Sequence, residues 1–325
     1  MNEFELIARY FGSSHHGADV LLGVGDDAAV LDVPAGYKLV AAVDTIVEGI
    51  HFPLNSNAGD IAWRALAVNL SDIAAMGAIP KWFTLSLCIP QVDESWLKEF
   101  AESLNHLAAQ FNVQLVGGDT VKGPLNISVQ IMGLVEQDQW LTRSGAKAGD
   151  LVYVSGAPGE AAGGLQLLLH PELQISQGEQ VHSSYLINRF LKPQPRVELG
   201  RLLRPFANAC MDVSDGLLGD LRKLCAASEC GAMLRLEQLP RSASLAAIFD
   251  EDRSEQLMLC GGDDYELLFT VAPSNISQVT QAASSCAVPC TCIGMINQSN
   301  ELRDVKCFRN NHEVHVSVNG FDHFA

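Results

Sequence analysis

Apolar and polar residues follow two different spacings along the first half of the chain. Short runs rich in β-branched and aromatic residues predict strands, and longer segments with apolar residues at helical intervals predict helices. These two kinds of element alternate. The predicted strands are residues 37–45, 81–90, 113–118 and 126–136, and the predicted helices are residues 59–78 and 94–111.

The second half alternates again after a short polar segment, "RSGAKAGD" at 143–150, whose composition is typical of a hinge. Strands are predicted at 151–156, 265–272, 290–296 and 313–320, and helices at 160–169, 195–206 and 216–228. With 325 residues, the chain is long enough for two domains. We therefore predict a two-domain α+β protein, in which residues 1–147 form a mixed sheet with helices and residues 148–325 form an α/β domain.

Composition narrows the classes of protein and partner. Hydrophobic residues make up 48% of the chain and charged residues 18%, as in a compact folded protein. The net charge of −17, without a basic stripe, argues against a nucleic-acid partner. No apolar run approaches the roughly 20 residues of a membrane-spanning helix, and the first residues do not resemble a secretory signal. We expect a cytoplasmic protein with neither a membrane nor a nucleic-acid partner.

The nine cysteines follow no disulfide framework. Cys286, Cys290 and Cys292 lie close together in the sequence, but no second cysteine pair or histidine pair completes a zinc site. Small buried thiols in a reducing compartment are the better interpretation.

Short acidic motifs recur along the whole chain. They are "GDDAA" (25–29), "VDT" (43–45), "NLSD" (69–72), "GGDT" (117–120), "DVSDG" (212–216) and "GGDDYE" (261–266). Most of them are expected where an apolar strand runs into a glycine or a turn, which is where sheets present functional groups. Asp72 differs, because it lies within a predicted helix of small and apolar residues, where a lone buried charge is costly.

Two interpretations of these motifs stay open at this point. Each motif alone is compatible with a turn or a helix cap, where Asp, Gly and Ser are common. Six together favour Mg²⁺ ligands around a polyphosphate, because Mg²⁺ binds one or two carboxylates together with substrate phosphate oxygens. Familiar nucleotide-binding sequences are absent: there is no GxxxxGK[ST] segment and no kinase HRD and DFG set, and "GVGDDA" lacks the third glycine of the dinucleotide fingerprint.

Taken in order, the motifs resemble those of the thiamine-monophosphate kinases, a family in the same superfamily as aminoimidazole ribonucleotide synthetase and selenophosphate synthetase. The resemblance covers nearly the whole chain, through "GVGDDAAVL", "VDTIVEGIHF", "ALAVNLSDIAAMGA", "GGDT", "LTRSGAKAGD", "DVSDGL", "GGDDYEL" and the closing "GFDHF". The order and spacing of these segments are far more specific than any one of them.

The resemblance implies transfer of the γ-phosphoryl group of ATP to thiamine monophosphate, with several Mg²⁺ ions, to give thiamine diphosphate and ADP. It also implies a homodimer formed through an N-terminal domain that binds ATP and Mg²⁺, and a C-terminal domain that completes the nucleotide and thiamine sites. By the same resemblance, the Mg²⁺ ligands are Asp27, Asp44, Asp72, Asp119, Asp212 and Asp215, the ATP contacts are Gly118, Asp119, Arg143 and Ser214, and the thiamine contacts are His51, Asp263 and Phe321.

The chain departs from the family pattern at three places. Ala42 and Val43 stand before Asp44 where the family often has hydroxyl residues, so that a metal ligand there must be a backbone carbonyl or water. Asp263 stands where the family usually has glutamate, which makes this side chain one methylene shorter. Phe321 occupies a position that can be Tyr or Trp in relatives, and any aromatic face there can stack on a thiamine ring.

The expected reaction needs no strong general base and no covalent residue. Its acceptor is a phosphate, which is already anionic near neutral pH. The difficulty is the repulsion between two anions, which metal ions reduce, and Arg143 can add a guanidinium contact to the triphosphate. We therefore assign no catalytic residue beyond the metal ligands.

Two other functions are compatible with the sequence. One is another ATP-using enzyme of the same superfamily with a different small substrate. Selenophosphate synthetase is disfavoured, because no Cys or Lys precedes the first acidic motif. The other is a non-catalytic protein that binds divalent metal, although the chain has no calcium loop of the D-x-D-x-D-G type.

Overall fold

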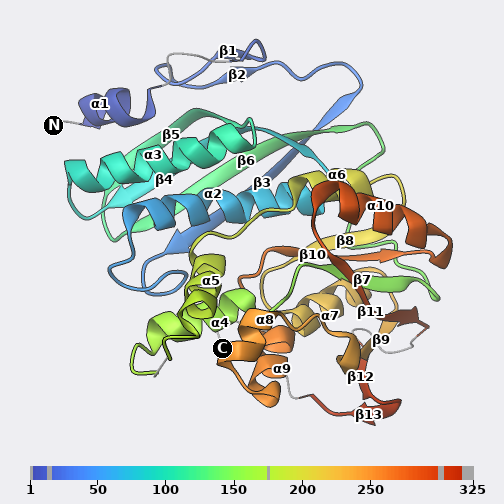
Figure 1. The fold of residues 1–325 in the computed structure, drawn as a ribbon. Helices are drawn as coiled ribbons and strands as arrows, with labels where there is room; N and C mark the ends of the chain where they lie inside the picture. Colours follow the sequence, from blue (N-terminus) through green and yellow to red (C-terminus); the bar gives the residue numbers. More distant parts are fainter. Residues whose placement is uncertain (1–2, 13–16, 174–175, 299–303, 317–325) are drawn as a thin grey trace. The chain divides into compact units, whose positions relative to one another are not determined.

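The computed structural model describes residues 3–12, 17–173, 176–298 and 304–316. The chain folds into two compact units, residues 1–73 with 78–138, and residues 74–77 with 139–325. Each unit is built on a β-sheet with helices packed against it (Figure 1). None of the helices in the described ranges combines the length and the apolar character that crossing a bilayer requires.

The first unit contains a mixed four-stranded sheet, as the sequence predicts. The strand order is β3-β6-β4-β5, in which β4 and β5 are parallel and the other two pairs are antiparallel. The strands are β3 (Tyr37–Val47), β4 (Ile79–Ile89), β5 (Gln114–Lys122) and β6 (Asn126–Glu136). Both β3 and β5 continue past their predicted ends. Asp119 therefore lies inside β5, and the expectation that it follows a strand end is wrong; Asp44 lies inside β3, within the strand predicted at 37–45.

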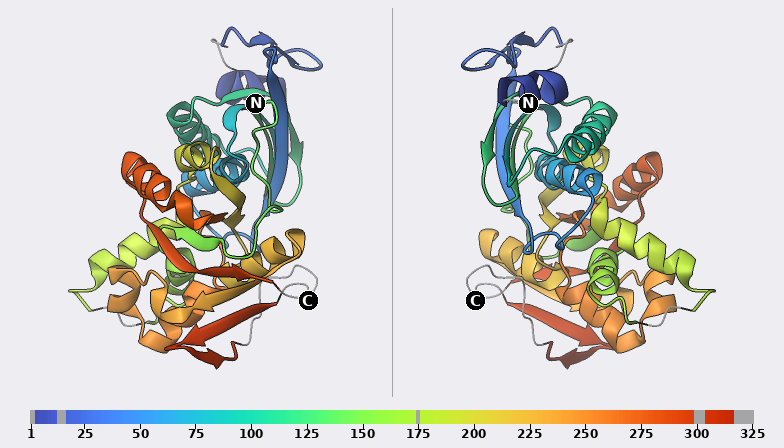
Figure 2. Two further views of the ribbon diagram at one scale, coloured as in Figure 1. Left: turned by 90° about the vertical axis from the view of Figure 1, so that its right-hand side faces the viewer. Right: turned by 90° about the vertical axis from the view of Figure 1, so that its left-hand side faces the viewer.

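Helices α2 (Ala58–Ala75) and α3 (Glu94–Gln110) lie on one face of this sheet (Figures 1 and 2). Asp93 caps α3, because its Oδ1 accepts hydrogen bonds from the backbone N–H groups of Ser95 (2.9 Å) and Trp96 (3.1 Å). The buried residues of α3 follow one another at intervals of one or three positions, along one stripe that packs inward. They are Leu97, Phe100, Ala101, Leu104, Leu107 and Ala108.

The other face of the sheet is partly covered by a small two-stranded sheet. Its strands are β1 (Val20–Leu22) and β2 (Val30–Leu31), and Val20 belongs to a buried cluster with Trp82 and Val116. Beyond this cluster the face carries exposed apolar side chains. The segments before β1 are α1 (Glu3–Leu6) and the π-helical η1 (Ile7–Phe11), which packs against α3.

The second unit contains a seven-stranded sheet in the order β13-β12-β9-β11-β7-β10-β8. Its strands are β7 (Leu151–Ser155), β8 (Ala207–Val213), β9 (Gly231–Arg235), β10 (Glu266–Val271), β11 (Cys290–Asn297), β12 (Val305–Arg309) and β13 (His312–Val314). Within this described sheet only β9 and β12 pair in parallel. The unit is thus α+β, and the α/β arrangement predicted for it is wrong. Alternating helices and strands form a parallel sheet only when crossovers join neighbouring strands.

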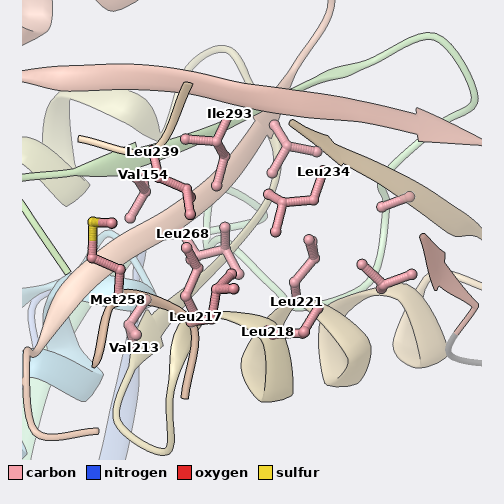
Figure 3. Packing of buried hydrophobic residues seen from close by; sticks show 14 of the residues in the cluster. Val154, Val213, Leu217, Leu218, Leu221, Leu234, Leu239, Met258, Leu268 and Ile293 are labelled. Carbon is pink, nitrogen blue, oxygen red and sulfur yellow. The ribbon is translucent and has the colours of Figure 1, made fainter. Parts of the chain in front are cut away.

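Helix α7 packs against this sheet (Figure 3), and α9 packs beside α7. The helices of the unit are α4 (Glu160–Leu169), α5 (Gln180–Leu191), α6 (Val197–Leu203), α7 (Leu217–Ala227), α8 (Ala243–Ile248), α9 (Glu251–Cys260) and α10 (Ile276–Cys286), with short 3₁₀ turns η2 (Leu236–Gln238) and η3 (Pro273–Asn275). Leu217, Leu218 and Leu221 of α7 are fully buried in the same cluster as Leu268 and Ile293 of the sheet. This packing fixes the start of α7, and with it the "DVSDG" turn that joins β8 to α7.

Candidate active site

Acidic side chains from two parts of the first unit line one pocket. The loop between β1 and β2 contributes Asp26 and Asp27, and β5 contributes Asp119. The pocket has a volume of about 360 Å³, and its wall also includes Gly118 and apolar side chains. Three residues expected at the site, Asp27, Gly118 and Asp119, therefore come together, although they are far apart in the sequence.

Gly118 occupies a position where the backbones of β5 and β4 approach closely. A Cβ atom at this residue would lie 2.0 Å from the carbonyl oxygen of Leu85. The neighbouring Gly117 is not constrained in this way, because its Cβ would lie 3.8 Å from the nearest atom, Cγ2 of Thr84. Glycine at residue 118 thus forms a pocket wall of bare main chain, which a phosphate group can approach.

The charges in this pocket fit divalent cations. Asp26, Asp27 and Asp119 are exposed, and the residues that line the pocket include neither Lys nor Arg. Such a group of carboxylates repels an anion unless cations bind between them. Within the described ranges, no three Asp, Glu, His or Cys side chains converge into a complete metal centre. Phosphate oxygens and water would have to supply the other ligands, which is the usual manner of Mg²⁺ binding.

Asp44 lies at the opposite edge of the same sheet. Across the strands it is in register with Gly118, the residue next to Asp119. Because successive residues of a strand point to opposite faces, the side chains of Asp44 and Asp119 point to opposite faces as well. Three strand spacings of about 4.8 Å also separate their strands. These two expected ligands therefore do not meet at one ion within a single copy of the sheet.

Asp72 lies inside α2, as the sequence predicts, and is half-buried. The preceding turn of the helix is tied to β3, because the backbone N–H of Asp44 donates to Oδ1 of the buried Asn69 (3.0 Å). His51 follows β3 and is half-buried, and its Nδ1 accepts a hydrogen bond from the backbone N–H of Val47 (3.0 Å). That bond leaves the ring proton of a neutral His51 on Nε2.

In the second unit, the "DVSDG" and "GGDDYE" motifs lie against each other. The backbone N–H of Asp263 donates to the carbonyl oxygen of Ser214 (2.8 Å), and that of Tyr265 donates to the carbonyl of Val213 (2.9 Å). A Cβ on Gly262 would lie 2.3 Å from the same Ser214 oxygen. Four expected site residues are thereby gathered in one place: Asp212, Ser214, Asp215 and Asp263.

Asp220 and Lys223 of α7 organise the "DVSDG" turn, and neither was expected at the site. Oδ2 of Asp220 accepts hydrogen bonds from the backbone N–H groups of Ser214 and Asp215, each at 3.0 Å. Nζ of Lys223 donates to Oδ1 of Asp220 (2.8 Å) and also to Oδ2 of Asp215. Burial raises the pKa of the Asp220 carboxyl, and the hydrogen bond and charge of Lys223 oppose that shift. The sequence signal was available, since both residues stand one helical turn apart just after the motif.

The second aspartate of "GGDDYE", Asp264, has a structural role. Asp264 is buried, and its carboxylate accepts hydrogen bonds from the backbone N–H groups of Gly159 (2.6 Å) and Ala161 (3.1 Å), at the start of α4. Burial raises its pKa well above the ordinary value for an aspartate. Asp263 and Tyr265 on either side have positive φ angles of 70° and 51°. This left-handed backbone turns Asp263 away from the buried side chain that follows it.

Glu266, at the end of the same motif, belongs to a buried ionic network. Its carboxylate accepts hydrogen bonds from Ser155 Oγ (2.5 Å), Arg189 Nη2 (2.7 Å) and Arg196 Nε and Nη2 (2.7 and 2.5 Å). Arg189 also donates through Nε to Glu160 (3.1 Å). Burial alone would raise the pKa of Glu266, but the two guanidinium groups and the hydrogen bonds outweigh it and lower the pKa. This network anchors the strand that follows Asp263.

No hydrogen bond of the described residues ties Arg143 to these groups. Arg143 lies in the loop before β7 and is exposed; its carbonyl oxygen accepts a hydrogen bond from Ser228 Oγ (3.0 Å). Phe321 lies outside the described residues, as does the rest of "GFDHF".

Comparison with known proteins shows to which protein family this chain belongs. The family model "AIR synthase related protein, N-terminal domain" matches residues 25–135, and "AIR synthase related protein, C-terminal domain" matches residues 147–305. The thiamine-monophosphate kinase of Escherichia coli (strain K12) is 45% identical over 324 residues, which cover 99% of this chain and 98% of that protein. The chain belongs to the thiamine-monophosphate kinase family.

Solved structures of the thiamine-monophosphate kinase family have the same fold. The enzyme from Stenotrophomonas maltophilia K279a superposes with a TM-score of 0.84 at 42% identity, covering 91% of this chain and 93% of that one. AaThiL complexed with AMPPCP and TMP superposes with a TM-score of 0.78 at 29% identity, covering 99% of this chain and 96% of that one. The resemblance identified from the motifs is thereby confirmed.

Proposed function

We propose that this protein transfers the γ-phosphoryl group of ATP to thiamine monophosphate and so forms thiamine diphosphate and ADP, as a step of thiamine diphosphate biosynthesis. One observation carries the proposal: the chain matches thiamine-monophosphate kinases over its full length. AaThiL, which has the same fold, was solved with AMPPCP and TMP together, so that one member of this fold holds both kinds of ligand.

We propose that the two halves of the chain bind different parts of the substrates. We assign ATP and Mg²⁺ binding to residues 1–147 and completion of the nucleotide and thiamine sites to residues 148–325. The bare backbone at Gly118 and the fork of Arg143 suit the triphosphate, and Ser214 is a further ATP contact. The residues assigned to Mg²⁺ are Asp27, Asp44, Asp72, Asp119, Asp212 and Asp215, and those assigned to the thiamine moiety are His51, Asp263 and Phe321.

Bound Mg²⁺ would supply neutralisation of the phosphate charges. The carboxylates named above hold that positive charge in place, and they repel phosphate groups that arrive without a metal. We propose direct in-line transfer, because the acceptor phosphate is already a nucleophile and the motifs contain no activated Ser–His or Cys–His pair.

We further propose a homodimer formed through the first unit. The face of its sheet opposite α2 and α3 exposes Val43 (61%), Leu39 (49%) and Val121 (45%), an unusual concentration of apolar side chains on a strand surface. A second copy of the chain would cover them. A sedimentation mass of one chain at working concentrations would contradict the dimer.

We place the reaction in the cytoplasm. All nine cysteines, which lie within the described residues, are free thiols, and free thiols persist in reducing compartments. Four of them are buried.

The test is release of ADP in the presence of different acceptors. The protein, ATP and Mg²⁺ should release ADP with thiamine monophosphate, and not with thiamine or without an acceptor. Replacement of Asp119 by Asn should abolish that release, because the substitution removes a carboxylate from the pocket and preserves its shape. ADP release that ignores thiamine monophosphate would point to another enzyme of the superfamily, and no ATP turnover at all would favour a metal-binding protein.

A further inference from the structure

The ammonium group of Lys223 contacts two carboxylates, one on a buried side chain and one on a partly exposed side chain. Its Nζ donates to Asp220 Oδ1 (2.8 Å) and to Asp215 Oδ2. The Asp220 side chain is fully buried, whereas that of Asp215 is 37% exposed. Asp220 is also fixed through its other oxygen by the backbone N–H groups of Ser214 and Asp215. Lys223 is therefore bonded both to Asp220, whose position is fixed by these hydrogen bonds, and to the more exposed Asp215.

We propose that Lys223 acts as a resident counter-ion for Asp215, and that a divalent cation binding to Asp215 must displace the ammonium group from it. The inference rests on the role of Asp215 as a Mg²⁺ ligand that is assigned above. The oxygen that accepts the lysine N–H is one of only two with which Asp215 can ligate a metal. An ammonium group beside that oxygen also repels an incoming cation. Lys223 thereby weakens metal binding at this site.

The anchor makes this competition reversible. When Lys223 leaves Asp215, it keeps its hydrogen bond to Asp220, whose buried carboxylate would be costly without a positive partner. The displaced ammonium group therefore stays beside the metal position. There it would lie near the triphosphate that Ser214 is assigned to contact, which adds a cation to the site once nucleotide is bound. The lysine thus disfavours metal without nucleotide more than metal with nucleotide.

The test measures Mn²⁺ binding, with the free ion followed by electron paramagnetic resonance, on the full-length protein with and without AMPPCP. Lys223→Gln removes the charge and keeps a hydrogen-bond donor for Asp220. It should bind Mn²⁺ at one site about two- to fivefold more tightly without nucleotide, the range that corresponds to a partly exposed charge pair. The gain should be smaller with AMPPCP. Lys223→Met, which has an apolar chain of similar length, should act in the same way and replaces the Gln variant should that fail to fold.

Three control variants test whether the effect depends on the charge of Lys223, on its location and on Asp215. Lys306→Gln removes a lysine of similar exposure (45%, against 42% for Lys223) that pairs with Glu313 on β13, and should leave Mn²⁺ affinity unchanged. Lys223→Arg keeps the charge and should bind as the native protein does. Asp215→Asn should remove the site and with it any effect of Lys223→Gln.

Unchanged or weaker Mn²⁺ binding in the charge-removing variants would overturn the inference. If Asp215→Asn removes one site while the Lys223 variants bind normally, only the counter-ion role fails. If Asp215→Asn removes no site, the assignment of Asp215 fails together with the inference. In either case ADP release with thiamine monophosphate decides the proposed reaction separately.

Discussion

Replacing Glu266 by Gln should strongly destabilise the second unit. Glu266 has no exposed surface and accepts four hydrogen bonds, three of them from the guanidinium groups of Arg189 and Arg196. A Gln side chain has the same shape, but it is neutral and offers one acceptor oxygen instead of two. One of the two arginines would lose its counter-charge, because Glu160 would be the one carboxylate left in this network.

The expected cost is about 3–5 kcal/mol, the usual effect of removing one partner from a buried ion pair. Hydrogen exchange of the β7 and β10 backbone amides measures this unit separately, which matters in a chain with two units. In the variant those amides should exchange about a hundred- to several-thousand-fold faster, since each 1.36 kcal/mol is a factor of ten. Glu198→Gln breaks a surface pair with Arg201 (2.7 Å) and should change exchange only slightly.

The same variant makes a prediction about pH. The pKa of Glu266 is lowered in the folded protein, so its charge stabilises the fold above its unfolded value of 4.5, and that stabilisation is lost as the pH falls through the folded pKa. The difference between the native protein and Glu266→Gln should therefore shrink below pH 4.5. Exchange rates that differ by less than about fivefold at neutral pH, or a difference that grows in acid, would refute this reasoning.

Two further substitutions test the first unit. Gly118→Ala should raise the KM for ATP about tenfold or more and destabilise the unit by about 1–3 kcal/mol, because its Cβ would lie 2.0 Å from the Leu85 carbonyl oxygen. Gly117→Ala is the matched control, because its Cβ would lie 3.8 Å from the nearest atom, Cγ2 of Thr84. Equal behaviour of the two variants would contradict the close-approach argument. Asp72→Asn should nearly abolish Mg²⁺-dependent turnover, while Asp60→Asn near the start of the same helix should not; unchanged turnover of Asp72→Asn at limiting Mg²⁺ would make Asp72 an ordinary helix residue.

Elements with strong periodicity could be predicted from the sequence. The helix predicted at 160–169 matches α4 in both ends, and the strand predicted at 126–136 matches β6. The strand β8 was missed, because "ANACMDV" consists mostly of small and polar residues with weak strand preference. Its place in the sheet comes from hydrogen bonding to β10, which local sequence does not encode.

The site residues divide in a similar way. The motifs themselves led to Asp27, Gly118 and Asp119, which the fold brings into one pocket. The motifs could not distinguish the half-buried Asp263 from the buried Asp264 and Glu266, because burial depends on distant partners such as Arg189 and Arg196. The sequence motifs also could not predict the face of the sheet on which each aspartate lies, because that face depends on strand register.

The central claim is that the γ-phosphoryl group passes directly from ATP to thiamine monophosphate. The measurement that tests it most directly is the reaction of ATP carrying a chiral, isotopically labelled γ-phosphoryl group with thiamine monophosphate and Mg²⁺, followed by analysis of the terminal phosphate of the product. Direct transfer should give labelled thiamine diphosphate with inverted configuration at phosphorus. Label in inorganic phosphate instead of thiamine diphosphate would contradict the function, and retained configuration would contradict direct transfer.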